Sequence, residues 1–213
     1  MQMIDLYTWT TPNGRKISIL LEELGAPYAV KPINIGKDEQ FAPAFLAISP
    51  NNRIPAIVDH DAEGGDLSVF ESGAILIYLA ETYGHAFLPA SGSGRWKALE
   101  WLSWQISGLG PMLGQLGYFL RAQDRVQSTI DRFAAESTRL LGVMDKRLKE
   151  ADYLAGDYSI ADMACYPWVA AMAPMLKTTP LIAGWDEMTG IHRWLDAIAA
   201  RPAVQRGMAV PQV

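Results

Sequence analysis

The residues around Pro55 could form one side of a peptide-binding site. Pro55 opens a β-prone run, where it cannot donate a hydrogen bond to a sheet. If the Ile54–Pro55 peptide bond is cis, the backbone N–H and C=O of Ile54 point outward. They can then pair with an extended peptide as a β-strand would.

The dipeptide Glu71-Ser72 stands where a predicted helix begins. The free N–H groups of the first turn, the Ser72 hydroxyl and the positive end of the helix dipole favour a carboxylate there. Glu71 supplies the opposite charge, which suits an ammonium. Taken alone, Ser72 can be only a helix cap and Pro55 only a turn residue. Their combination favours a site for a peptide that carries both an α-amine and an α-carboxylate.

The elements that position these residues alternate between strands and helices in the first half of the chain. The order is β-α-β, then a short helix, then β-β-α, with Gly64-Gly65 as the turn between the last two strands. A β-α-β unit implies parallel pairing and a hairpin implies antiparallel pairing, so we expect a mixed four-stranded sheet. The expected strands are 4–7, 28–33, 56–58 and 67–70; the expected helices are 13–24, ending at Gly25, 41–48, and 72–83 with Ser72 as its N-cap.

The second half has a helical pattern throughout. Residues 1–83 form the predicted first domain, 84–94 a linker rich in Gly, Ser and Pro, and 95–213 an all-helical domain. Ser159-Ile160-Ala161-Asp162 predicts a capping box, with Asp162 returning a hydrogen bond to the Ser159 backbone. The expected helices are 96–121, kinked near Gly108-Leu109-Gly110-Pro111, 126–150, 159–172 and 190–200.

Composition limits the classes of partner. The formal net charge is -5 and the pI is about 5.2, which disfavours nucleic acid and acidic membrane surfaces. No apolar run approaches the roughly 20 residues of a membrane span, and the N-terminus does not resemble a signal peptide. The sole cysteine, Cys165, has no partner for an internal disulfide, which favours a reducing, cytoplasmic setting. The three histidines follow no metal-ligand spacing, so we expect no metal site.

Together these motifs resemble the glutathione site of the glutathione transferase superfamily over essentially the whole chain. The resemblance implies a thioredoxin-like N-terminal domain, a C-terminal helical bundle, glutathione as co-substrate and a homodimer. It assigns Ile54-Pro55 to the cysteinyl backbone of glutathione and Glu71-Ser72 to its γ-glutamyl end. More narrowly, the chain resembles bacterial nu-class transferases. The matching segments are Thr11-Pro12-Asn13-Gly14, Ser49–Asp59, Phe70–Leu79 and Trp104–Gln115.

The first loop indicates how a thiol would be activated. Thioredoxin-fold reductases carry a cysteine at the start of the first helix, and this chain carries Thr11 and Asn13 there instead. The nucleophilic sulfur must therefore come with the ligand. Thr11 can donate its hydroxyl to that sulfur, and Asn13 its amide or backbone N–H. The alternative is that both are ordinary loop and cap residues.

Other ligand contacts are expected from weaker signals. Arg53 could attract the glycyl carboxylate, Gln40 could reach the same end, and Asn52 could bind glutathione or only hold the loop. Three residues of the helical half are candidates for a second-substrate pocket, although aromatic side chains on helices more often belong to the core: Tyr118, Phe119 and Arg132.

Three functions compete on these residues. The first is reduction of small disulfides by exchange with glutathione sulfurs activated by Thr11 and Asn13. The second is conjugation of glutathione to an electrophile. The third is an interaction module without turnover, which would have no need of the full set of site residues. We expect Cys165, in an apolar helix, to be a small buried hydrophobe with no redox role.

Overall fold

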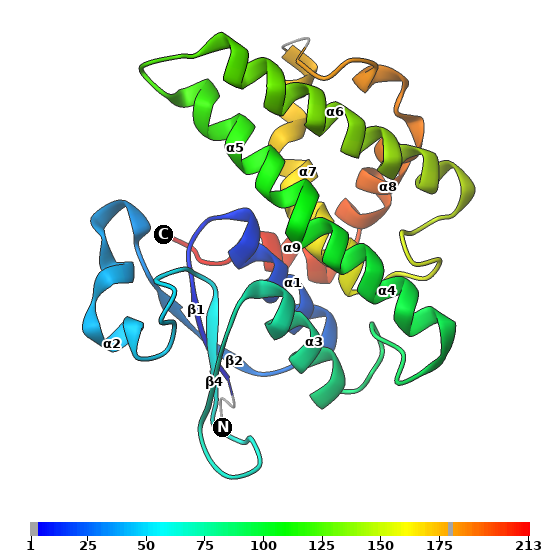
Figure 1. Cartoon of the computed structure of the whole chain (residues 1–213). Coiled ribbons are helices and arrows are strands. Elements are labelled where there is room, and N and C mark those ends of the chain that lie inside the picture. Colours follow the sequence, from blue (N-terminus) through cyan, green and yellow to red (C-terminus); the bar gives the residue numbers. More distant parts are fainter. Residues whose placement is uncertain (1–3, 179–180) are drawn as a thin grey trace. The chain divides into compact units, whose positions relative to one another are not determined.

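The computed structural model describes residues 4–178 and 181–213, and the chain forms two compact units (Figure 1). The first unit contains the residues up to Ala90 together with Ala200–Val213, and the second contains Ser91–Ala199. This division differs from the sequence-based one, which placed everything from residue 95 onward in the helical domain. The difference arises because the last helix packs within the first unit.

A four-stranded mixed sheet forms the centre of the first unit, in the order β2-β1-β3-β4. β1 (Ile4–Thr8) pairs in parallel with β2 (Tyr28–Pro32) and antiparallel with β3 (Ala56–Asp59). β4 (Leu67–Phe70) pairs antiparallel with β3. The parallel and antiparallel pairings expected from the sequence are both confirmed, as is the thioredoxin-like fold of this half.

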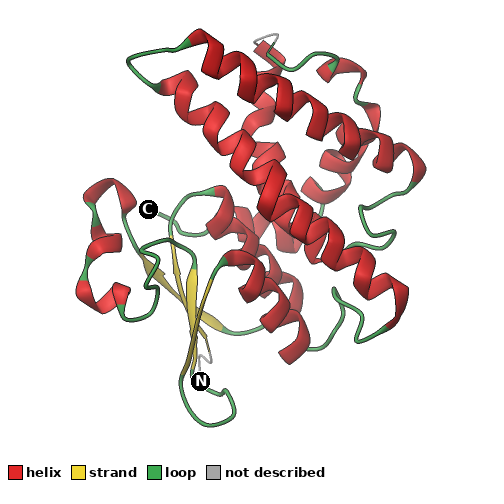
Figure 2. Ribbon diagram, in the orientation of Figure 1, coloured by secondary structure: helices red, strands yellow, loops and turns green. Residues whose placement is uncertain are grey.

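Helices cover both faces of this sheet. α1 (Pro12–Leu24) and α3 (Ser72–Thr82) pack together on one face, and the short α2 (Pro43–Leu46) lies on the other (Figure 2). Two 3-10 turns, Ile35–Lys37 and Glu39–Phe41, precede α2. Glu71 occupies the N-cap position of α3 and Ser72 is the first helical residue, so the expected N-cap at Ser72 is wrong by one position. Capping is a role of the N-cap residue, and Ser72 is at the next position, N1. Its hydroxyl is therefore available for other contacts.

The C-terminal helix α9 (Pro202–Met208) packs against α1, and no sequence pattern predicted this. The Ser18 hydroxyl donates to the Gly207 carbonyl at 2.7 Å. A Cβ on Gly207 would lie 2.6 Å from the Cα of Ile19, so only glycine allows this approach of the two helices. Arg201 holds Glu23 with two hydrogen bonds of 2.6 and 2.9 Å. As a result α1 is buried on more sides than its amphipathic pattern predicts.

The second unit is entirely helical, apart from its connections, within the residues that the structure describes. The first two helices are joined by a π-helical turn at Gln105–Leu109, close to the kink that the sequence predicts. The third predicted helix is longer than expected and continues beyond Met172. The helices are α4 (Gly92–Trp104), α5 (Gly110–Arg121), α6 (Gln127–Glu150), α7 (Ile160–Thr178) and α8 (Thr189–Ala199).

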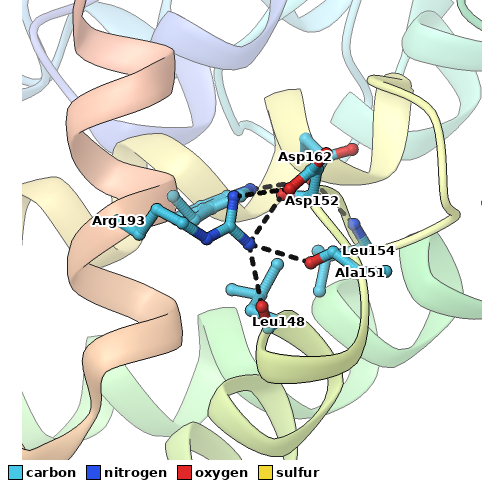
Figure 3. Close-up of polar contacts among 7 residues, drawn as sticks. Leu148, Ala151, Asp152, Leu154, Asp162 and Arg193 are labelled. Atoms are coloured by element: carbon cyan, nitrogen blue, oxygen red, sulfur yellow. Dashed lines mark hydrogen bonds and ion pairs between the residues drawn. The ribbon is translucent and has the colours of Figure 1, made fainter.

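Asp162 forms the predicted capping box at the start of α7. It also links α7 to other segments of the second unit, and Figure 3 shows its contact with Leu154. The Ser159 N–H donates to Asp162 Oδ2 at 3.1 Å, and the Ala161 N–H donates to Ser159 Oγ at 3.3 Å. Asp162 Oδ1 accepts from the Leu154 N–H at 3.1 Å and from Trp194 Nε1 at 2.8 Å. Burial raises the pKa of the Asp162 carboxyl to about 6, although these donors oppose the shift. The carboxyl therefore joins α7, α8 and the preceding loop.

Across residues 4–178 and 181–213, none of the helices combines the length and apolar character that a membrane crossing requires.

Candidate functional site

A cleft of ≈ 270 Å³ in the first unit brings together three segments that are far apart in the sequence. They are the start of α1, the loop before β3, and the junction of β4 with α3. The residues that line the cleft are Asn13, Asn51, Arg53, Ile54, Pro55, Phe70, Glu71 and Ser72. Of the predicted glutathione-binding residues, Arg53, Ile54, Pro55, Glu71 and Ser72 thus lie around one hollow.

The start of α1 presents Thr11 and Asn13 in different ways. Thr11 is the N-cap, and its side-chain oxygen accepts from the Gly14 N–H at 3.2 Å. This bond uses a lone pair of the hydroxyl oxygen, so the hydroxyl hydrogen can still be donated. Asn13 lies in the first turn and lines the cleft, whereas Thr11 is absent from the cleft lining. Capping the helix and donating to a sulfur are therefore compatible roles for Thr11.

The loop before β3 meets the condition on which the sequence argument depended. The Ile54–Pro55 peptide bond is cis. Ser49 is fully buried, and its hydroxyl donates to the Arg53 carbonyl at 2.9 Å. Asn52 has a φ of 49° and donates its N–H to the Ser49 carbonyl at 2.9 Å. Asn52 is absent from the cleft lining, and its left-handed backbone supports the loop-holding alternative.

The junction of β4 with α3 presents Glu71 and Ser72 to the cleft. Glu71 has a φ of 70°, in the left-handed region that few non-glycine residues adopt. Its carboxylate accepts a hydrogen bond of 3.1 Å from the side-chain amide of Asn51. The first-turn N–H groups of α3 follow directly, and helix geometry leaves such groups without an intrahelical acceptor. The Glu71 carboxylate therefore lies next to the N–H donors at the start of α3. A ligand that carries an ammonium and a carboxylate on the same carbon requires such a pair of groups.

Lys16 lies behind Ser72 and was not among the predicted site residues. Its side chain is 2% exposed, and its ammonium donates to Ser72 Oγ at 3.4 Å. The sequence did contain a signal, because Lys16 precedes the buried Ile19 and Leu20 by three and four residues. That spacing places Lys16 on the same face of α1 as apolar core residues.

Gln40 is not brought to the cleft lining. It lies in the 3-10 turn Glu39–Phe41, and its side-chain amide donates to Asp38 Oδ1 at 3.4 Å. Its predicted contact with glutathione stays a prediction.

The three residues proposed for a second-substrate pocket line two different hollows of the second unit. Tyr118 and Phe119 line one, and Arg132 lines another with Phe133. The Phe119 ring stacks on the Phe133 ring at a centroid distance of 5.6 Å, while Tyr118 is 62% exposed. Among the hollows formed by the described residues, Arg132 thus lies apart from Tyr118 and Phe119, and their shared second-substrate pocket stays a prediction.

Neither the sole cysteine nor a metal centre contributes to the cleft. Cys165 is fully buried in α7, in the second unit. In the part of the chain that the structure describes, no three His, Cys, Asp or Glu side chains gather as a metal site would require.

Two family models match this sequence. The model of the glutathione S-transferase N-terminal domain matches residues 2–81, and that of the C-terminal domain matches residues 110–202. The chain belongs to the glutathione S-transferase family. All the residues that line the cleft of this transferase-family chain fall within the N-terminal domain match.

Similar proteins and structures extend along the full length of this transferase-family chain. The disulfide-bond oxidoreductase YfcG of Escherichia coli is 46% identical over 218 residues, covering 99% of this chain and 97% of the relative. A crystal structure of a Pseudomonas putida glutathione transferase with one glutathione disulfide bound per subunit is 41% identical, with a TM-score of 0.91, and the match covers 99% of this chain and 92% of that one. A Burkholderia graminis glutathione transferase with two glutathione molecules bound per subunit is 42% identical, with a TM-score of 0.93 and coverage of 99% and 89%.

Proposed function

We propose that this protein reduces small disulfides with glutathione by thiol–disulfide exchange in which the ligand supplies every reacting sulfur. The observation that carries the proposal is where the candidate thiol-activating groups and the cysteine lie: Asn13 lines the cleft at the start of α1, Thr11 caps that helix, and the sole cysteine is buried in the other unit. The Escherichia coli relative is named a disulfide-bond oxidoreductase, and the Pseudomonas putida structure holds a glutathione disulfide. Both support this chemistry.

The cleft offers a complementary group for each part of glutathione. Glu71 pairs with the γ-glutamyl ammonium, and Ser72 with the first-turn N–H groups of α3 receives the α-carboxylate. The backbone of Ile54 pairs with the cysteinyl backbone, and Arg53 attracts the glycyl carboxylate. This arrangement directs the cysteinyl sulfur toward the start of α1.

Thr11 and Asn13 would stabilise the thiolate form of that sulfur. A free thiol has a pKa of about 8.5. A hydrogen bond to a charged acceptor contributes roughly 1.5–3 kcal/mol, and one pKa unit corresponds to about 1.4 kcal/mol. One or two such bonds are therefore sufficient to hold the thiol largely ionised near neutral pH without a dedicated base.

The exchange takes two displacements. The thiolate of one glutathione attacks a sulfur of the substrate disulfide, which forms a mixed disulfide and releases the first substrate thiolate. The thiolate of a second glutathione then attacks the glutathione sulfur of the mixed disulfide and releases the second. The protons lost by the two glutathiones end on the two released thiols, and the products are two thiols and glutathione disulfide.

A parallel assay tests this function. Glutathione-dependent reduction of 2-hydroxyethyl disulfide and conjugation of chlorodinitrobenzene are measured on the same preparation. We expect the larger kcat/KM for disulfide reduction. A larger kcat/KM for conjugation would replace the proposal with a general transferase activity. Failure to be retained on glutathione resin, with neither activity, would indicate a non-catalytic interaction module.

We further propose a nu-class transferase that works as a homodimer in the cytoplasm. The resemblance of the first loop and of Trp104–Gln115 to nu-class transferases supports the class and the assembly. A sequence with a single cysteine cannot form an internal disulfide, which is consistent with a reducing compartment. Sedimentation at micromolar concentration tests the assembly, and a monomer of 23.4 kDa would contradict it.

A further inference from the structure

Lys16 is a buried cation next to the cleft, in the second turn of α1. Its side chain is 2% exposed and is among the largest fully buried side chains in the described part of the chain. Lysine is almost never fully buried unless a partner offsets the cost of removing its charge from water. A charge retained in such a position is therefore expected to act on a nearby group.

Lys16 contacts Ser72, one of the residues that line the cleft. The ammonium donates to Ser72 Oγ at 3.4 Å, between helices α1 and α3, which pack together (Figure 1). Ser72 itself is 9% exposed, so its hydroxyl lies between the buried ammonium and the opening. An oxygen that accepts from an ammonium keeps its own hydrogen for another acceptor. The hydroxyl hydrogen is thereby free to point into the cleft.

We propose that Lys16 is a positioning residue that recognises the α-carboxylate of the γ-glutamyl group through Ser72. It orients the Ser72 hydroxyl as a donor to that carboxylate and places a positive charge behind it. This inference rests on the proposed glutathione function and names a residue that determines its specificity. Lys16 and Glu71 then form a pair of opposite charges that matches the carboxylate and the ammonium of one amino-acid end.

The buried position strengthens this effect. Charges interact more strongly in a protein interior than in water, and salt screens a buried charge less than an exposed one. Lys16 does not reach the ligand through solvent, so its contribution depends on the Ser72 contact and on proximity. A purely structural lysine would instead stabilise the fold and leave the choice between ligands unchanged.

Two glutathione analogues separate these roles. 4-Aminobutyryl-cysteinylglycine lacks only the α-carboxylate, and glutaryl-cysteinylglycine lacks only the ammonium. Binding of each analogue and of glutathione is measured by titration calorimetry on the wild type, Lys16→Met and Lys31→Met. Lys31 is the matched control, because it lies in the same unit but pairs with Asp5 on the surface.

We expect Lys16→Met to lose roughly 10- to 100-fold in affinity for glutathione, the range of a charge-assisted contact. It should lose little for the analogue without the carboxylate, so its preference for glutathione over that analogue falls. Its preference over the analogue without the ammonium should persist, and Lys31→Met should behave as the wild type. Methionine is apolar and of similar volume, so the melting temperature should be unchanged or higher.

An equal loss for all three ligands, or an unchanged preference for the carboxylate, would overturn the role of Lys16 while the proposed function stands. A wild type that binds no glutathione would overturn both. If Lys16→Met does not fold, Lys16→Gln, which keeps a donor without the charge, gives the same comparison. In the double variant Lys16→Met with Ser72→Ala, the affinity for glutathione should fall by less than the product of the fold-changes of the two single variants. The two residues act on one carboxylate, so their effects are not independent.

Discussion

The side-chain amide of Asn51 donates a 3.1 Å hydrogen bond to the carboxylate of Glu71, which lies 20 residues further along the chain. Both residues line the same cleft, one from the loop before β3 and the other from the start of α3. The bond therefore links the cleft's two walls through Glu71, the one carboxylate among the described residues that line it.

Removal of this carboxylate should weaken the binding of glutathione. Glu71→Ala deletes the partner of the ligand ammonium, and we expect a loss in affinity of roughly 10- to 100-fold. The Asn51→Ala substitution keeps the charge of Glu71 and removes only the hydrogen bond that supports it, so the affinity for glutathione should fall by about threefold to tenfold. Titration calorimetry measures both. The exposed Glu63 on the β3–β4 connection provides the matched control, Glu63→Ala, and equal affinities for Glu63→Ala and Glu71→Ala would contradict the assignment.

Thr11 and Asn13 should control the ionisation of the bound thiol. Thr11→Val and Asn13→Ala each remove a donor that favours the thiolate, so both should raise the pKa of bound glutathione, and kcat should fall more than affinity. Thr11→Ser keeps the hydroxyl and should restore the wild-type titration. Thiolate absorbance against pH provides the measurement, with the exposed Thr10→Ala as control. Unshifted titrations in both variants would place the sulfur elsewhere.

Cys165 should be dispensable for turnover. The side chain is fully buried in α7, so its sulfur is not accessible to a dissolved substrate. Cys165→Ala should leave kcat/KM for disulfide reduction unchanged. It should lower the free energy of unfolding by about 1 kcal/mol, because it opens a small void in the core. Loss of activity in a folded Cys165→Ala protein would refute a mechanism based on ligand sulfurs alone.

The stability of the second unit should depend on the protonation of Asp162. Burial raises the pKa of this carboxyl to about 6 in the folded protein. The folded state therefore binds more protons than the unfolded state between pH of about 4 and about 6. The contribution of Asp162 to the free energy of unfolding is thus fully present below this window and decreases as the pH rises through it.

Chemical denaturation of the wild type and of Asp162→Asn across this window isolates the effect, because the variant cannot titrate. The Asp162→Asn substitution should also lower the free energy of unfolding by about 2–4 kcal/mol, because two or more buried hydrogen bonds lose their acceptor. Asp152→Asn is the control: Asp152 is 83% exposed and only pairs with Arg193, so the loss should stay below about 1 kcal/mol (Figure 3). Identical pH profiles for the wild type and Asp162→Asn would contradict the prediction.

Local chemistry determined the features that could be predicted from the sequence. The capping box at Ser159 and Asp162 follows from residue types spaced three apart at a helix start, and the structure confirms both of its hydrogen bonds. The parallel β1–β2 pair and the antiparallel β3–β4 pair follow from a β-α-β unit and a hairpin, each made of consecutive elements. Such features depend on residues that are close in sequence.

Only the tertiary structure decided which distant residues meet. The packing of α9 on α1, the hydrogen bond from Asn51 to Glu71, and the burial of Lys16 behind Ser72 all join segments separated by long stretches of chain. An amphipathic pattern states which side chains of a helix prefer to be buried, but it does not state what packs against its polar side. The spacing within α1 thus predicted its core face and placed Lys16 on it, whereas the contact of Lys16 with Ser72 depended on the position of α3, which that spacing cannot encode.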